Sequence, residues 1–148
     1  MEAPPVSEEQ LEEVLEWIDG MTFSRATRNL ARDFSDGVLM AEVMKHEFPN
    51  VVQLHNYQPA NSSAAKYVNW KTLNEKIFKK IGFQIHRHDI ENIINNTPES
   101  IEKVLHLVYC RILAHKSNPN QFGLTDRNSN EKVTTNRKGK TENIDYAK

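Results

Sequence analysis

The chain has 148 residues, of which 26% are charged and 38% are hydrophobic, and its formal net charge is −1. This length and composition are typical of one globular domain with its own core. No run approaches the roughly 20 apolar residues of a membrane-spanning helix, and the acidic start of the chain does not resemble a secretory signal. The single cysteine, Cys110, excludes a disulfide framework within the chain and indicates a reducing, intracellular compartment.

The charge is unevenly distributed along the chain. The first 20 residues contain seven acidic side chains and no basic one, so the remainder of the chain is basic. A basic body behind an acidic leading segment favours an oriented encounter with an acidic partner.

The first predicted helix follows Ser7 and ends at Gly20. Ser7 and Gln10 have the spacing of a capping box, in which each side chain accepts a hydrogen bond from the other residue's backbone N–H. Apolar residues then recur at helical spacing and predict one buried stripe: Leu11, Val14, Leu15 and Ile18.

An irregular link is expected over residues 21–29, and a second helix is expected to begin after Asp36, its predicted N-cap, and to reach His46. Pro49 cannot continue that helix. Residues 49–63 combine prolines with Asn and Ser and therefore predict a loop. The inner face of the second helix is predicted to be apolar: Val38, Leu39, Ala41 and Val43.

A long third helix is predicted between Ser63, as its cap, and Ile81, with Gly82 at the C-terminal position. A shorter helix is predicted over residues 89–96. The predicted apolar positions of these two helices are Trp70, Leu73, Ile77, Phe78, Ile81, Ile90, Ile93 and Ile94.

A last helix is predicted to have Thr97 as its N-cap and Pro98 as its first helical residue, and to run to about His115. Its apolar side consists of Ile101, Val104, Leu105, Val108 and Ile112. No segment alternates like a strand, so the predicted fold class is all-α, with one domain over residues 7–116. Residues 117–148 are polar and are predicted to form a tail that is disordered alone or ordered along a partner.

Motifs for chemistry are weak throughout the sequence. His86 and His88 are two residues apart and have no third ligand nearby, so no metal site is predicted. Asp33 and Asp36 resemble an acid–base pair, but a cap and a turn explain them better. Cys110 lies outside any nucleophile motif, and the glycines form no phosphate-binding loop. The sequence therefore predicts neither an enzyme nor a cofactor.

Basic residues form the strongest functional signal. A solvated charged face is the usual explanation of such residues, but two clusters of one sign in a domain without a catalytic motif favour a polyanionic partner. A filament surface, a nucleic acid and lipid headgroups all remain open on this evidence. The candidate binding residues are Arg25, Arg28, Arg32, Lys66, Lys71, Lys76, Lys79 and Lys80.

Five ordered motifs carry a family resemblance: the segment from Arg28 to Leu39, Phe48-Pro49, His55-Asn56-Tyr57, the segment from Asn69 to Asn74, and the segment from Lys79 to Phe83. Together they resemble a calponin-homology domain. The variant is similar to the sperm flagellar protein 1 family, also called calponin-homology and microtubule-associated proteins, over roughly residues 7–116; the spermatogenesis-associated protein 4 family is a related alternative.

The resemblance implies a microtubule-binding or bundling structural protein of the axonemal central pair in cilia and flagella. Lys71 matches a lysine that contributes to tubulin contact in related microtubule end-binding domains. Two interpretations of the basic segment from Arg137 to Lys140 in the tail stay open: contact with tubulin or a neighbouring axonemal protein, or a solubilising end that resembles a nuclear-localisation signal by chance. Family members usually continue into a longer helical, dimerising region, which this polar tail does not resemble.

Two other functions stay open at this stage. Calponin-homology domains also serve as actin-linked or signalling adaptors, although actin binding commonly takes two domains in tandem. Binding to nucleic acid rests on the basic clusters alone and lacks a recognition helix, so neither nucleic acid nor membrane is the expected partner.

Overall fold

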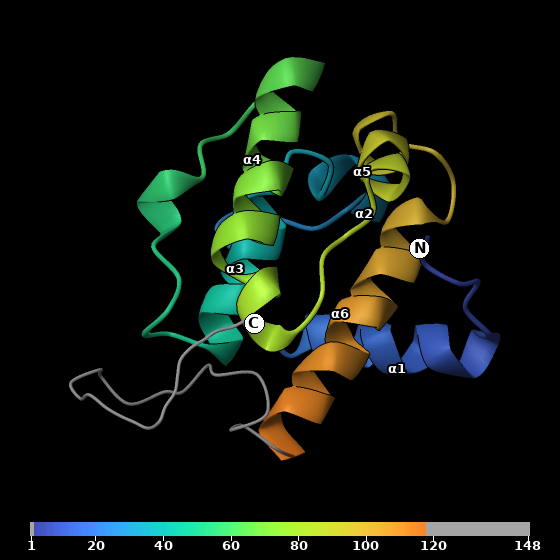
Figure 1. The fold of residues 1–148 in the computed structure, drawn as a ribbon. Coiled ribbons are helices and arrows are strands. Elements are labelled where there is room, and N and C mark those ends of the chain that lie inside the picture. The colour runs from blue at the N-terminus through green and yellow to red at the C-terminus, as the bar shows by residue number, and fades with distance from the viewer. Residues whose placement is uncertain (1, 118–148) are drawn as a thin grey trace.

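The computed structural model describes residues 2–117, which form helices and connecting loops with no β-strand in that range (Figure 1). The all-α class predicted from the sequence is confirmed. The predicted tail lies outside the described residues, except for Ser117, which ends the last helix. In chain order the α-helices are α1 (Glu8–Asp19), α2 (Leu30–Asp33), α3 (Val38–Glu47), α4 (Ser63–Lys76), α5 (Arg87–Ile94) and α6 (Ser100–Ser117), and the 3-10 segments are η1 (Leu54–Asn56) before α4 and η2 (Phe78–Ile81) after it.

The α3 helix is buried in the core along most of its length. Its apolar residues are buried on every side of the helix, so they do not form the single stripe of a surface helix. In Figure 1, α6 packs across α1. The N-cap of α3, Gly37, lies close to Asn69 and Trp70 of α4. The buried residues of α3 are Val38, Leu39, Met40, Ala41, Val43 and Met44.

The predicted capping box at the start of α1 is confirmed. The Ser7 hydroxyl accepts from the Gln10 N–H at 3.1 Å, and the Gln10 side chain accepts from the Ser7 N–H at 3.0 Å. The predicted stripe is too wide, however, because Val14 and Ile18 are buried while Leu15 is 38% exposed. Leu15 lies about 100° around the helix from Val14, beyond the strip that the neighbouring helix covers.

The start of α3 is shifted by one residue from the prediction. Gly37, with φ of 84°, is the N-cap, and the helix extends one residue past the predicted end to Glu47. The Asp36 carboxylate nevertheless accepts from the Val38 N–H at 3.0 Å, so it satisfies a first-turn donor as expected of a capping aspartate.

The prediction of one helix from a Ser63 cap to Ile81 is wrong at both ends. Ser62 is the cap, and α4 ends at Lys76 before the tighter η2 turn. The Asn74 side chain donates to the Ile85 carbonyl and accepts from the Ile85 N–H, at 3.0 and 2.8 Å. Because these bonds hold the returning chain against α4, the helix has to turn early, and Gly82 completes the turn with φ of 90°.

The boundaries of α5 and α6 also differ from the prediction. The His86 ring accepts from the His88 N–H, so α5 begins at Arg87. At its other end Asn96 has φ of 58°, and the Thr97 N–H donates to the Asn92 carbonyl. This is a Schellman ending. Glu99 then has φ of 70°, so the backbone is not helical there, and α6 begins at Ser100 and continues past His115 to Ser117.

Glu47, the last residue of α3, joins α3 to α1 and α6. Its carboxylate accepts from Trp17 Nε1 of α1 at 3.0 Å and from the Lys116 ammonium of α6. Burial alone would raise the pKa of Glu47, but the hydrogen bonds from Lys116 and Trp17 outweigh it and hold the pKa below its ordinary value.

Candidate interaction surface

The segment Ser35–Gly37 joins α2 to α3 and forms a buried polar junction. Asp36 is only 5% exposed. Its two carboxylate oxygens each lie 3.2 Å from Arg25 Nη2, and the carboxylate also accepts from the N–H groups of Val38 and Ala60. The buried charge is therefore paired and hydrogen-bonded, as a stable buried carboxylate requires.

Two residues of α4 lock onto this junction. The Asn69 amide donates to the carbonyls of Asp36 and Gln58, each at 2.8 Å, and Trp70 Nε1 donates to the Ser35 carbonyl at 2.9 Å. A Cβ at Gly37 would lie 3.1 Å from the Asn69 Cβ. The motifs over residues 28–39 and 69–74, far apart in the sequence, thus contact each other in the fold.

Two of the eight candidate cations point into this junction. Arg25 pairs with Asp36, and its side chain is 39% exposed. Lys66 is half-buried and donates to the Ser35 hydroxyl at 3.1 Å, and that hydroxyl donates to the Arg32 carbonyl. Arg25 and Lys66 therefore fix the position of the α2–α3 connection.

Arg28 precedes α2, Arg32 lies within it, and both are exposed. Between them, the Asp33 carboxylate accepts from the N–H groups of Arg28 and Asn29 at 2.7 and 2.9 Å and lies 3.6 Å from Arg32 Nε. Burial opposes ionisation, but these backbone N–H groups and the nearby arginines outweigh it, so the pKa of Asp33 is lowered. The local turn is thus held by an ionised carboxylate, while the two guanidinium groups face solvent.

The outward face of α4 contains Val68, Lys71 and Lys76. Val68 is 59% exposed, and the Lys71 side chain is 60% exposed. At about 100° per residue, Lys71 lies about 60° to one side of Val68 and Lys76 about 80° to the other. Lys71 has a long ion pair of 3.9 Å with the equally exposed Glu75, which stabilises little and leaves the ammonium available.

Lys79 and Lys80 are exposed on η2, beyond the end of α4. From Lys66 to Lys76 the rise along α4 is about 15 Å. The candidate cations therefore do not meet at one point. Arg25 and Lys66 are engaged in the junction, and the other six are exposed before and on α2, on α4 and on η2.

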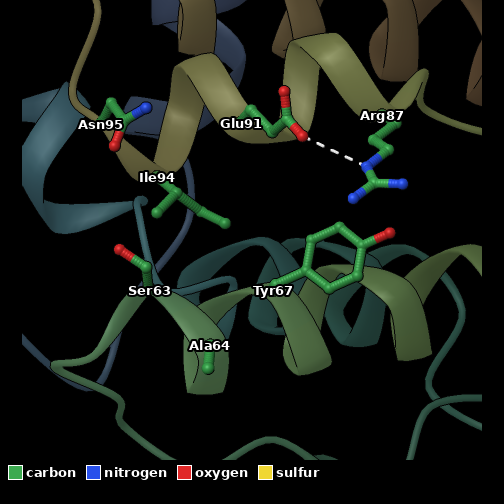
Figure 2. A pocket seen from close by; sticks show the side chains of 7 residues that line it. All are labelled: Ser63, Ala64, Tyr67, Arg87, Glu91, Ile94 and Asn95. Carbon is green, nitrogen blue, oxygen red and sulfur yellow. Dashed lines mark hydrogen bonds and ion pairs between the residues drawn. The ribbon is translucent and has the colours of Figure 1, made fainter.

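Sequence reasoning missed a groove of about 300 Å³ between α4 and α5 (Figure 2). Ala64 and Tyr67 of α4 face Arg87 and Ile94 of α5 across it. Arg87 was passed over because it lies in a short His-rich segment, and Tyr67 because it lies off the apolar stripe. The i, i+4 pair of Arg87 and Glu91, 3.1 Å apart, is the one signal of this site that the spacing in the sequence contains.

Cys110 and the possible metal ligands do not form a catalytic or metal-binding arrangement within residues 2–117. Cys110 is exposed as a residue, and its Sγ lies 3.5 Å from His106 Nε2. The pKa of its thiol is raised, mainly because the sulfur is partly desolvated and also because the Glu13 carboxylate is near. Within the part of the chain that the structure describes, no three His, Cys, Asp or Glu side chains gather closely enough to hold a metal ion. Among residues 2–117, no helix combines the length and hydropathy needed to cross a bilayer.

Known proteins with similar sequences carry this description further. The family described as "CH-like domain in sperm protein" matches residues 14–110. Sperm flagellar protein 1 of Xenopus laevis is 44% identical over 105 residues, which is 71% of this chain and 46% of that protein. The proteins of the same name from Bos taurus and Homo sapiens are each 46% identical over 103 residues, or 70% of this chain and 44% of theirs.

The chain thus spans less than half the length of these relatives. The matched region contains the interlocked motifs of the junction, all of α4 and α5, and most of α6. With its helical fold, this match identifies the chain as a member of the family of calponin-homology-like domains found in sperm proteins.

Proposed function

We propose that this chain is a microtubule-binding structural protein of the ciliary or flagellar axoneme, acting at the central-pair microtubules by stabilising or bundling them. The flagellar location is supported by the name of the relatives, sperm flagellar protein 1. The names of the family and of these relatives describe a domain and a flagellar protein, and none describes an enzyme.

The observation that carries the microtubule proposal is the exposed pair Lys71 and Lys76 on either side of the outward face of α4. The tubulin lattice is acidic, so exposed lysines on a rigid helix speed encounter and fix orientation. Arg28, Arg32, Lys79 and Lys80 extend this charge. Arg25 and Lys66 contribute by holding Asp36 and Ser35, which directly follow the segment that bears Arg28 and Arg32.

The first test is co-pelleting of the full chain with taxol-stabilised microtubules and, in parallel, with F-actin, each at low and high salt. Pelleting with microtubules alone, weakened by salt, is the expected result because salt screens exposed charges. Pelleting with F-actin alone would replace the proposal with an actin-linked adaptor. Pelleting with neither filament would remove the proposal.

The second test is charge reversal of single lysines. Lys71→Glu is expected to lower microtubule affinity about tenfold, since it replaces an attraction with a repulsion on an acidic lattice. Lys103→Glu, on α6, makes the same change of charge away from α4 and serves as the matched control. Equal affinities for Lys71→Glu and the unmodified chain would exclude this face of α4.

A further inference from the structure

The groove between α4 and α5 adjoins the outward face of α4, because Ala64 and Tyr67 lie one helical turn before Val68 and Lys71. We propose that this groove receives an apolar side chain of tubulin together with a neighbouring acidic one. The inference rests on the proposed function and adds to it a contact that does not depend on the lysines.

The groove offers an apolar surface at its centre. Ile94 is half-buried on the α5 side, Ala64 is exposed on the α4 side, and the ring of Tyr67 closes one end (Figure 2). Val68, 59% exposed, continues this surface on the adjoining ridge. An apolar side chain seated here would remove several carbon atoms from water on both partners, and salt screens such a contact far less than a charge pair.

The groove also has a fixed cation at its edge. The Arg87 side chain is 75% exposed, its Nε lies 3.1 Å from Glu91 Oε2, and its Cζ lies 5.7 Å from the centre of the Tyr67 ring. The ring and the carboxylate hold the guanidinium in place. An exposed, oriented guanidinium binds a carboxylate through two parallel hydrogen bonds, so the groove favours an acidic occupant.

The charge around the groove favours the acidic tubulin lattice as the partner that occupies it. Lys71 follows Tyr67 by one turn on the same helix, so two exposed cations flank the Tyr67 side of the groove. Glu91 offsets part of this charge, and it is already bound to Arg87. An acidic surface that presents an apolar side chain therefore fits both the shape and the charge.

The test uses substitutions that leave the charge of the chain unchanged. Ala64→Gln puts a longer, polar and helix-compatible side chain at the groove, and Ala114→Gln makes the same change at an exposed site on α6. Microtubule co-pelleting of the full chain is measured at low and high salt, with thermal unfolding to check that both variants fold. We expect Ala64→Gln to weaken binding about tenfold at both salt concentrations and Ala114→Gln to leave it unchanged.

Arg87→Gln sharpens the result. It should weaken binding mainly at low salt and make the dependence of affinity on salt less steep, and Arg87→Lys should restore part of the loss.

The outcomes separate the two proposals. Salt-sensitive pelleting of the unmodified chain with unchanged affinity in Ala64→Gln would overturn the groove and leave the proposed function in place. Failure of the unmodified chain to pellet at either salt concentration would overturn both. If Ala64→Gln altered only the sedimentation of the free chain, the groove would belong to a second copy and not to tubulin.

Discussion

The Ser35–Gly37 junction and the outward face of α4 contain the same kinds of cationic side chain in different surroundings. At the junction, Arg25 binds the carboxylate of Asp36, a residue that is 5% exposed. Lys66 binds the hydroxyl of Ser35, a residue that is 2% exposed. On the outward face, the only ion pair that Lys71 makes in the described residues is 3.9 Å long, to an exposed glutamate. The first group holds the fold, and the second is available to a partner.

The difference teaches that a basic cluster in a sequence mixes two kinds of residue. Lys66 and Lys71 are five positions apart on one helix, which is about 140° of rotation. One therefore points at the α2–α3 connection and the other at solvent, although their local sequences are equally basic. Of the eight predicted binding residues, Arg25 and Lys66 also make contacts within the fold, so their substitution is expected to affect stability as well as any binding.

The largest expected effect is on the junction side of the comparison. Asp36→Ala would leave Arg25 and the N–H groups of Val38 and Ala60 without this acceptor. We expect a loss of about 3 kcal/mol in the free energy of unfolding, measured by urea denaturation. Glu75→Ala, on the outward face, should change it by less than about 0.5 kcal/mol. Similar losses in the two variants would break the comparison.

Backbone geometry gives the next effect. Gly37 has φ of 84°, and a Cβ there would lie 3.1 Å from the Asn69 side chain. Gly37→Ala should therefore lower the free energy of unfolding by about 1–2 kcal/mol. Gly20→Ala is the matched control, because Gly20 has φ of −77° and its nearest contact would be an ordinary 3.5 Å. The comparison of midpoints in urea would show whether the close approach of α4 to the junction matters.

Lys66→Met and Lys71→Met test the two regions with one substitution. Lys66→Met removes a hydrogen bond to Ser35 and should cost about 1 kcal/mol of stability. Lys71→Met removes a weak exposed pair and should leave stability within about 0.5 kcal/mol, while lowering microtubule affinity. The reverse pattern, with Lys71 needed for folding and Lys66 for binding, would contradict the division proposed for the cations.

The smallest effect concerns pH at a second internal carboxylate. The pKa of Glu47 is lowered in the folded chain, so its contribution is complete above the ordinary glutamate pKa of about 4.3 and is lost as pH falls through the lower folded value. The unmodified chain should exceed Glu47→Gln in stability by about 1 kcal/mol near neutral pH, with the difference shrinking below pH 4.3. Thermal unfolding between pH 3 and 7 measures this, and a difference that grows on acidification would show that the sign is wrong.

Local signals in the sequence predicted part of the fold correctly. The capping box of Ser7 and Gln10 and the turn at Gly82 each depend on a few neighbouring residues, and both are present. The apolar positions of α6 were also predicted correctly, because helical periodicity is a property of one segment alone.

Predictions failed where a helix boundary depends on how the following segment turns. Thr97 has the sequence of an N-cap, but the chain turns again at Glu99, which has φ of 70°, and α6 begins only at Ser100. The helix from Ser63 was predicted to continue through Lys76, but Asn74 binds the returning backbone at Ile85 and the chain turns. Helix propensity could not predict either boundary, because each depends on residues outside the local sequence pattern.

The sequence by itself determined the all-helical class, most apolar core positions and the excess of basic residues over the body of the chain, because periodicity and composition are local properties. The tertiary structure alone decided which cations face inward, where α4 ends, and that Arg87 meets Tyr67 beside a groove. These features depend on contacts between residues 11 to 31 positions apart, such as Arg25 with Asp36 and Lys66 with Ser35. Folding brings such pairs together because other residues become buried. The positions of the paired residues in the sequence therefore do not predict that they are in contact.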